Sequence, residues 1–269
     1  MNKILLIAWI TFKDCIRNRA LYGIFFLGLI LFVANIVFTG MFTWELGKVA
    51  VDMGLSIISF SGLIIIFFMC LPLMSNDLVN KTIYLILSRP VTKTDYIVGK
   101  YFGLGSVIVI SSVFLGLCSA LSVRLSVLGA ETFIPPHFSW PLFAASIATL
   151  TLSLLVLLSL SILWTCVSTH HFTAVLLTLM TYFICQNMEN VKNIILSTKF
   201  MAPDALPIKV INAVSWVLPN LAAFNLKTTA AYGLPVNLAS FSWILAYGVS
   251  YIAICIMLAV KIFKRRELP

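Results

Sequence analysis

The sequence predicts an all-α integral membrane protein with six transmembrane helices. The chain of 269 residues is 61% hydrophobic and 10% charged, with a mean hydropathy of +1.06, whereas soluble proteins carry about 25% charged residues. Six apolar runs reach or approach the roughly twenty residues that a helix needs to cross hydrocarbon. Because backbone groups find no water partner in lipid, each run is expected to be helical.

The six predicted spans follow one another along a single transmembrane domain that covers residues 1–269. We place them at residues 21–41, 53–74, 101–123, 141–164, 172–186 and 241–262. The fifth run is the shortest, and its ends are the least sharply marked.

Residues 1–20 precede the first span and predict an amphipathic helix that lies in the membrane interface. Four apolar side chains recur at helical spacing on one stripe, namely Leu5, Trp9, Phe12 and Ile16. The basic residues, Arg17 and Arg19 among them, suit anionic lipid headgroups. The alternative is a ragged extension of the first spanning helix.

The basic residues predict the orientation of the chain. They are concentrated in the N-terminal segment, in the connection between the second and third spans, and in the C-terminal segment. The positive-inside rule therefore places both termini and that connection in the cytoplasm. The net charge of +9 would also suit nucleic acid, but its placement beside apolar runs favours membrane lipid and excludes nucleic acid as a partner.

Residues 188–240 form a long connection on the opposite, extracytoplasmic side. Prolines such as Pro203 and Pro219 interrupt it. We expect short extracytoplasmic helices here and no seventh span.

The most polar run of the first half is NDLVNKTIYLILSRPVTKTDYIVGKYFG, residues 76–103. Asn76 or Asp77 is expected to cap a short amphipathic helix over residues 76–88. Arg89 and Pro90 end it, because the residue before proline is displaced from the helical region. Thr92 or Thr94 would then cap the next helix. From these patterns alone, an ordinary charged loop is an equally good interpretation.

This run resembles the signature region of permease subunits of type-2 ATP-binding-cassette (ABC) exporters. The matching positions include Asp77, Ser88, Pro90, Gly99 and Lys100, although Lys81 stands where the family usually has glycine. The basic start of the chain is similar to the family's interfacial helix. VLPNLAAFNL, residues 217–226, resembles a motif of the branch that includes the nitrous-oxide-reductase-maturation and gliding-motility permeases.

The resemblance implies a permease of a bacterial-type inner membrane that couples to a separate ABC ATPase. The residues expected at the ATPase contact are Asp77, Thr82, Ile83, Ile86, Leu87, Ser88, Arg89, Pro90 and Lys93. The implied pathway follows the second and fifth spans, with candidates Ser56, Ser59, Ser61, Gly62, Thr173, Thr178 and Thr181. A second permease copy, or a related permease, would complete the membrane unit.

The chain has no phosphate-binding loop of its own, since Gly99-Lys100 lacks the required preceding glycine. ATP and magnesium are therefore expected in the partner ATPase, and this chain is expected to hold no cofactor, metal or catalytic residue. Its three histidines suggest no metal site, because His170 and His171 are adjacent and point apart. The sequence leaves open two alternatives, a secondary transporter and a membrane anchor for a regulatory ATPase. Few ionisable residues within the spans argue against the first.

Overall fold

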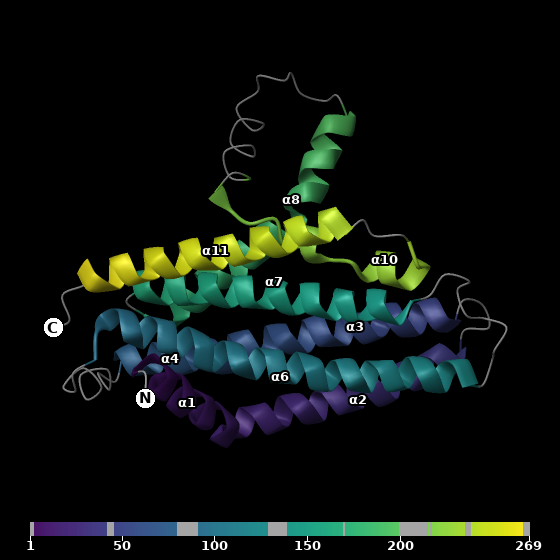
Figure 1. Cartoon of the computed structure of the whole chain (residues 1–269), viewed down its shortest axis with the longest axis horizontal. Coiled ribbons are helices and arrows are strands. Elements are labelled where there is room, and N and C mark those ends of the chain that lie inside the picture. Colours follow the sequence, from purple (N-terminus) through teal and green to yellow (C-terminus); the bar gives the residue numbers. More distant parts are fainter. Residues whose placement is uncertain are drawn as a thin grey trace.

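The computed structural model describes residues 3–41, 46–79, 91–128, 139–168, 170–198, 215, 217–234 and 238–265. Every regular element within these ranges is a helix, which confirms the predicted all-α class there. The long helices α2, α3, α6, α7 and α11 lie side by side along one axis, and α1 lies at the end of the bundle where α11 ends (Figure 1). The elements are α1 (Lys3–Arg17), α2 (Arg19–Met41), α3 (Leu46–Ile65), η1 (Ile66–Cys70), α4 (Leu71–Val79), α6 (Lys93–Leu128), α7 (Trp140–Val167), α8 (His171–Thr198), η3 (Leu221–Phe224), α10 (Lys227–Tyr232) and α11 (Leu238–Arg265).

Four helical segments are long and apolar enough to cross a membrane: 48–77, 93–125, 140–167 and 239–265. A fifth is obtained if α1 and the following 21–37 segment, bent by 62° around Asn18, count as one broken span. The predicted run 172–186 occupies the first half of α8, and Asn187 and Glu189 follow it in the same helix. Figure 1 shows α8 crossing the other helices steeply, with its C-terminal part projecting beyond them.

The second predicted span is longer than expected and contains a π-helical turn. α3, η1 and α4 form one continuous helical segment from Leu46 to Val79, with η1 over Ile66–Cys70. The expected helix start at Asn76 or Asp77 is wrong, since α4 runs through both residues. Asp77 does not cap a helix because its carboxylate is engaged by side chains of α6.

α6 begins with a capping box. The Thr92 hydroxyl accepts from the backbone N–H of Asp95 at 3.2 Å, and the Asp95 carboxylate accepts from that of Thr92 at 3.1 Å. This exchange satisfies two backbone donors that a helix start leaves free. Thr92, and not Thr94, is therefore the capping residue of α6.

α1 packs directly onto the first turns of α6 through two glycines. A Cβ atom at Gly103 would lie 2.6 Å from Thr11 Cβ, and one at Gly99 would lie 2.7 Å from Ile7 Cβ. The contact face of α1 is Ile7, Thr11 and Cys15. The stripe predicted to be apolar lies elsewhere on the helix, with Leu5, Trp9 and Ile16 exposed and Phe12 partly buried. The charged residues occupy a third face, which includes exposed Arg17.

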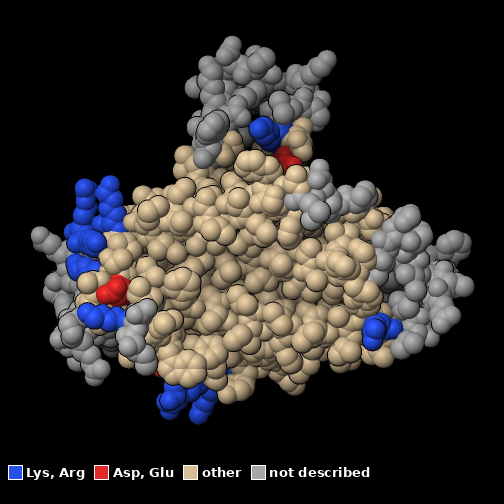
Figure 2. All heavy atoms as spheres, viewed as in Figure 1, with Lys and Arg blue, Asp and Glu red and all other residues tan. Residues whose placement is uncertain are grey.

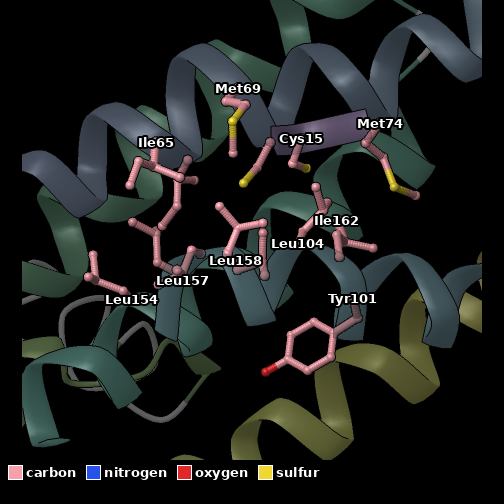
Figure 3. Packing of buried hydrophobic residues seen from close by; sticks show 14 of the residues in the cluster. Cys15, Ile65, Met69, Met74, Tyr101, Leu104, Leu154, Leu157, Leu158 and Ile162 are labelled. Atoms are coloured by element: carbon pink, nitrogen blue, oxygen red, sulfur yellow. The ribbon is translucent and has the colours of Figure 1, made fainter. Parts of the chain in front are cut away.

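The main core joins α1, α2, α3, η1, α4, α6, α7 and α11. In Figure 3, Ile65 and Met69 face Leu154, Leu157 and Leu158 of α7. Cys15 of α1 lies in the same layer. This core ties the terminal half of α3–α4 to α6 and α7, so these elements are expected to move together.

Most of the visible surface carries no charged side chains. Figure 2 shows most of the visible Lys and Arg at one end of the bundle and below it, with smaller basic patches at the opposite end and at the top, while the broad middle is uncharged. The exposed basic residues of the described chain at this end include Lys13, Arg17, Arg19, Lys264 and Arg265. An uncharged belt with basic residues at one end is the distribution expected of a membrane-embedded protein.

Candidate functional site

Among the polar residues that lie between the apolar helices in the described part of the chain, a first group is at the end of the bundle where α4 stops and α6 starts. Asp77 of α4 forms an ion pair with the Lys100 ammonium of α6. Tyr96, one turn before Lys100, donates its hydroxyl to the same carboxylate oxygen of Asp77 at 2.9 Å. We call Asp77, Tyr96 and Lys100 the ion-pair cluster.

The ion-pair cluster is buried. The side chains of Lys100 and Asp77 are 8% and 23% exposed, and Tyr96 is fully buried. The Lys100 ammonium also lies 5.8 Å from the centre of the Tyr96 ring. Buried charges of this kind require a partner, because desolvation of an unpaired charge costs several kcal/mol. The cluster therefore fixes α4 against α6.

α11 is joined to the same place. The Tyr96 ring stacks on Phe263 with centroids 6.2 Å apart. Lys93 lies over the Phe263 ring at 5.8 Å and donates to the Lys264 carbonyl at 3.5 Å. The last turn of α11 thus contacts the first two turns of α6.

Only two of the residues predicted at the ATPase contact lie within the described part of the chain, Asp77 and Lys93. The others, Thr82, Ile83, Ile86, Leu87, Ser88, Arg89 and Pro90, lie outside the described residues. The structure joins the two ends of the quoted run through Asp77 and Lys100. Sequence analysis noted both residues but did not predict that they pair.

The second group lines a pocket between α3, α7, α8 and the segment from η3 to α10. The pocket is small, with a cavity volume of about 60 Å³, and it is open on one side. Five leucines form its apolar wall. Its polar residues are Ser59, Ser153, Tyr182, Gln186, Asn225 and Lys227. We call it the Lys227 pocket.

The segment 217–234 reaches this pocket because its own polar groups hold it in place. The Asn220 side chain accepts from the Ala222 N–H at 3.1 Å and donates to Glu189 of α8 at 3.2 Å. Phe224 is fully buried and stacks on Tyr247 of α11 with centroids 6.0 Å apart. These contacts anchor η3 between α8 and α11, and Lys227 follows three residues later.

Lys227 brings a positive charge into the pocket. Its ammonium donates to the Ser56 hydroxyl of α3 at 3.3 Å. Burial lowers the pKa of Lys227, and the carboxylate of Asp52, one turn before Ser56, partly opposes this by raising it. Asp52 is exposed, and within the part of the chain that the structure describes no carboxylate comes within ion-pair distance of the ammonium. Asp52 and Tyr182 are the titratable groups that face Lys227 from α3 and α8.

The predicted pathway residues are distributed over several environments. Ser59 lines the Lys227 pocket and Ser56 bonds Lys227. Ser61 is buried toward α2, and Gly62 packs on Leu154.

The three threonines of α8, Thr173, Thr178 and Thr181, each donate to a carbonyl of their own helix at 2.7–2.8 Å. None of the three lines the Lys227 pocket. Helix packing therefore describes their hydroxyls better than ligand contact does.

Sequence analysis missed Tyr182, Gln186, Asn225 and Lys227. Gln186 carried a signal, since it is the polar residue that ends the predicted run 172–186. Lys227 directly follows the quoted VLPNLAAFNL stretch. The composition around Lys227 is that of a connecting segment. The sequence therefore does not reveal that this lysine lies between the long helices.

No family model matches this chain, and no curated protein matches it. The geometry of the described chain is therefore the basis for the proposals that follow.

Proposed function

We propose that the chain is the transmembrane subunit of an ATP-binding-cassette transporter and works with a separate ATPase and a second permease copy. The proposal rests on the residues of the quoted run and on one structural observation. The run begins and ends on two helices, and its Asp77 and Lys100 form a buried ion pair. A force applied to the run would therefore act on α4 and α6 together.

The path from this point to the Lys227 pocket is continuous. α4 continues through η1 into α3, and Ser59 on α3 lines the pocket. π-helical turns are rare and are found often at functional sites, where they allow local changes of helix register. In the proposed mechanism, closure of the ATPase pair moves α4 and α6 as one body, and η1 passes part of that motion to the pocket.

The test is purification of the tagged, detergent-solubilised chain from its native membrane, with identification of every co-purifying subunit. A double variant, Ile83→Asp with Ile86→Asp, places two charges on the predicted apolar face of the quoted run. The matched control is Val191→Asp, a substitution of an exposed aliphatic residue in the second half of α8. Co-purification of an ABC ATPase that is lost in the double variant and kept in the control supports the proposal.

Absence of any ABC ATPase, under conditions that keep a known ABC complex intact, would refute the proposal. An ATPase that binds both variants equally would refute the role of the quoted run. A bound ATPase without any substrate-stimulated hydrolysis would favour the membrane-anchor alternative.

Lys227 favours a secondary transporter as the second candidate. An ionisable side chain in a pocket between membrane-length helices is a group that carriers driven by ion gradients use. Proteoliposomes that contain this chain alone separate the two candidates. A proton flux driven by a pH gradient, and lost in Lys227→Met, would support the carrier; no flux without an ATPase supports the ABC permease.

A further inference from the structure

We propose that a groove at the end of the bundle opposite the ion-pair cluster binds an anionic phospholipid. The groove is lined by Leu117, Ala120, Leu121 and Arg124 of α6 and by Trp140, the first residue of α7. We call it the Arg124 groove. In the proposed complex, the lipid phosphate contacts the Arg124 guanidinium and one acyl chain lies over the two leucines.

The Arg124 groove lies at the level of a membrane boundary. α6 ends and α7 begins at the end of the bundle away from the chain termini (Figure 1). Arg124 is in the last turn of the membrane-length segment Lys93–Leu125, and Trp140 begins the segment Trp140–Val167. The rise along α6 from Lys100 to Arg124 is roughly 36 Å, somewhat more than the roughly 30 Å of a hydrocarbon core. A cation and a tryptophan at this level face the phosphates of one leaflet.

The leucines of the groove are exposed, at 63% for Leu117 and 57% for Leu121. The groove has a volume of about 480 Å³, within the roughly 300–1,000 Å³ that ligand clefts occupy. Val113, which is also exposed, continues the same stripe of α6 toward the middle of the helix. From Arg124 to Val113 the stripe is roughly 16 Å long. This length matches half of the roughly 30 Å hydrocarbon core, and hence the acyl chain of one leaflet.

The exposed guanidinium of Arg124 supplies the contact with the headgroup. It lies 5.8 Å from the centre of the Trp140 ring. Within the described residues, no carboxylate forms an ion pair with it. A contact with a ring leaves the N–H groups at the edge of the guanidinium available, and these can bind two oxygens of one phosphate. Trp140 therefore orients the guanidinium without neutralising its charge.

The net charge of the headgroup distinguishes the proposed ligand from other phospholipids. A phosphatidylcholine headgroup carries the same phosphate but brings a second cation close to Arg124, which repels it. A phosphatidylglycerol headgroup has no cation, so its phosphate neutralises the guanidinium. Both effects are larger beside hydrocarbon than in bulk water, because the local dielectric constant is lower. The groove is therefore expected to prefer anionic lipid over zwitterionic lipid with identical acyl chains.

The experiment measures quenching of Trp140 fluorescence by brominated phospholipids around the reconstituted full chain. Bromine on an acyl chain quenches a tryptophan only at close contact. The vesicles contain equal amounts of phosphatidylglycerol and phosphatidylcholine, with bromine on the acyl chains of one lipid or of the other. Each protein is compared with the same protein carrying Trp140→Phe, and the difference is the Trp140 signal. The ratio of quenching by the two brominated lipids gives the lipid preference at Trp140.

Arg124→Gln removes the charge from the groove. Lys48→Gln is the matched control, because Lys48 begins another membrane-length segment at the same end of the bundle and also lies over an aromatic ring, that of Tyr232, at 4.6 Å. This control removes one positive charge from the same end without changing a residue of the groove. Size-exclusion profiles and circular dichroism establish that each variant is folded.

We expect phosphatidylglycerol to quench Trp140 at least threefold more strongly than phosphatidylcholine in the wild type and in Lys48→Gln. In Arg124→Gln the two lipids should quench equally. Equal quenching in the wild type, or a preference that survives Arg124→Gln, would overturn the proposal. Trp140 that neither lipid quenches would be covered by protein, which would overturn it as well.

An excess of inorganic phosphate distinguishes a lipid site from a site for the free anion. The preference for phosphatidylglycerol should remain, because inorganic phosphate has no chain to cover the leucines. Loss of the preference would assign the groove to a free anion and overturn the proposal. All of these outcomes are independent of the co-purification test, because no ATPase takes part in the measurement.

Discussion

The ion-pair cluster gives the sharpest test of the structure. Substitution of Asp77 by Asn leaves the Lys100 ammonium buried without a carboxylate. Removal of one partner from a buried pair costs about 3–5 kcal/mol. At about 2–4 °C per kcal/mol for a chain of this size, Asp77→Asn should lower the Tm by roughly 6–20 °C.

The reverse substitution, Lys100→Met, should cost less. Asp77 is the more exposed partner, at 23% against 8% for the Lys100 side chain. It also keeps the hydrogen bond from Tyr96. A buried polar group that loses one partner costs about 1–3 kcal/mol, and the Tm loss should be correspondingly smaller. The double variant D77N/K100M removes both charges and should recover most of the stability, because neutral replacements of a buried pair are often well tolerated.

The assay is thermal unfolding of the detergent-solubilised chain, followed by fluorescence-detected size exclusion. Lys261→Met, an exposed lysine of α11, is the control and should leave the Tm unchanged. From the highest Tm to the lowest, the expected order is wild type, double variant, Lys100→Met and Asp77→Asn. If the Tm loss of the double variant equals the sum of the Tm losses of the single variants, the pairing is refuted. The pairing is also refuted if the Tm of each single variant lies within 1 °C of the control, because one kcal/mol corresponds to roughly 2–4 °C.

Three further outcomes follow from packing and charge. Gly103→Ala should destabilise the chain by about 1–3 kcal/mol, since the new Cβ would lie 2.6 Å from an atom of α1. Gly23→Ala is the control and should be neutral, because a Cβ there has nothing within 4 Å. Thermal unfolding of the two variants measures the difference. Deletion of Phe68, an exposed residue of η1, should convert the π turn to an α-helical turn, because a π turn holds one residue more than an α-helical turn. Asp77 should then keep the face of α4 that meets Lys100, and the Tm should fall far less than in Asp77→Asn. A Tm loss as large as that of Asp77→Asn would show that η1 does not accommodate one extra residue. Burial lowers the pKa of Lys227 from its ordinary 10.5. Between the lowered pKa and 10.5, the unfolded chain therefore binds more protons than the folded chain. The free energy of unfolding of the wild type, relative to Lys227→Met, should rise as the pH increases through this range. The Tm difference between these two proteins, measured from about pH 7 to about pH 10, should therefore grow in favour of the wild type, and a constant difference would show that the ammonium is solvated.

The helical class and most element positions could be predicted from the sequence because they depend on the lengths of apolar runs. Apolar runs placed α2, α6, α7 and α11 within a few residues of their centres. The run 53–74 also identified its helix, but not the π turn over Ile66–Cys70. Apolar residues surround that turn on both sides, so no pattern in the sequence distinguishes its register from that of an α-helix.

The two polar groups show where sequence reasoning stops. Asp77 and Lys100 were recognised as parts of one motif, but their pairing depends on the antiparallel return of α6 against α4. Lys227 joins Ser56 across 171 positions of the chain. Contacts of this separation follow from tertiary packing, which local periodicity does not encode.

The glycines of α6 illustrate a question that the structure resolves. In the sequence, Gly99 and Gly103 fit a helix contact or a loop-to-helix transition equally well. The structure places both under α1, where a Cβ would overlap Ile7 or Thr11. The apolar and charged residues of α1 are then separated on its two remaining faces, as an interfacial helix requires.

α11 is buried far less than the other membrane-length helices, with 17% of its apolar window covered against 50–61% for the other three. Its buried residues form one narrow face, namely Gly248, Cys255, Ala259 and Phe263. At the two ends of this face Gly248 packs on Leu152 and Phe224, and Phe263 stacks on Tyr96. Substitution should therefore be tolerated very unevenly along this helix. The outward positions, such as Trp243 at 76% exposure, can change among apolar residues, while the buried face should accept few replacements. One narrow face therefore carries most of the mutational constraint of this 28-residue helix.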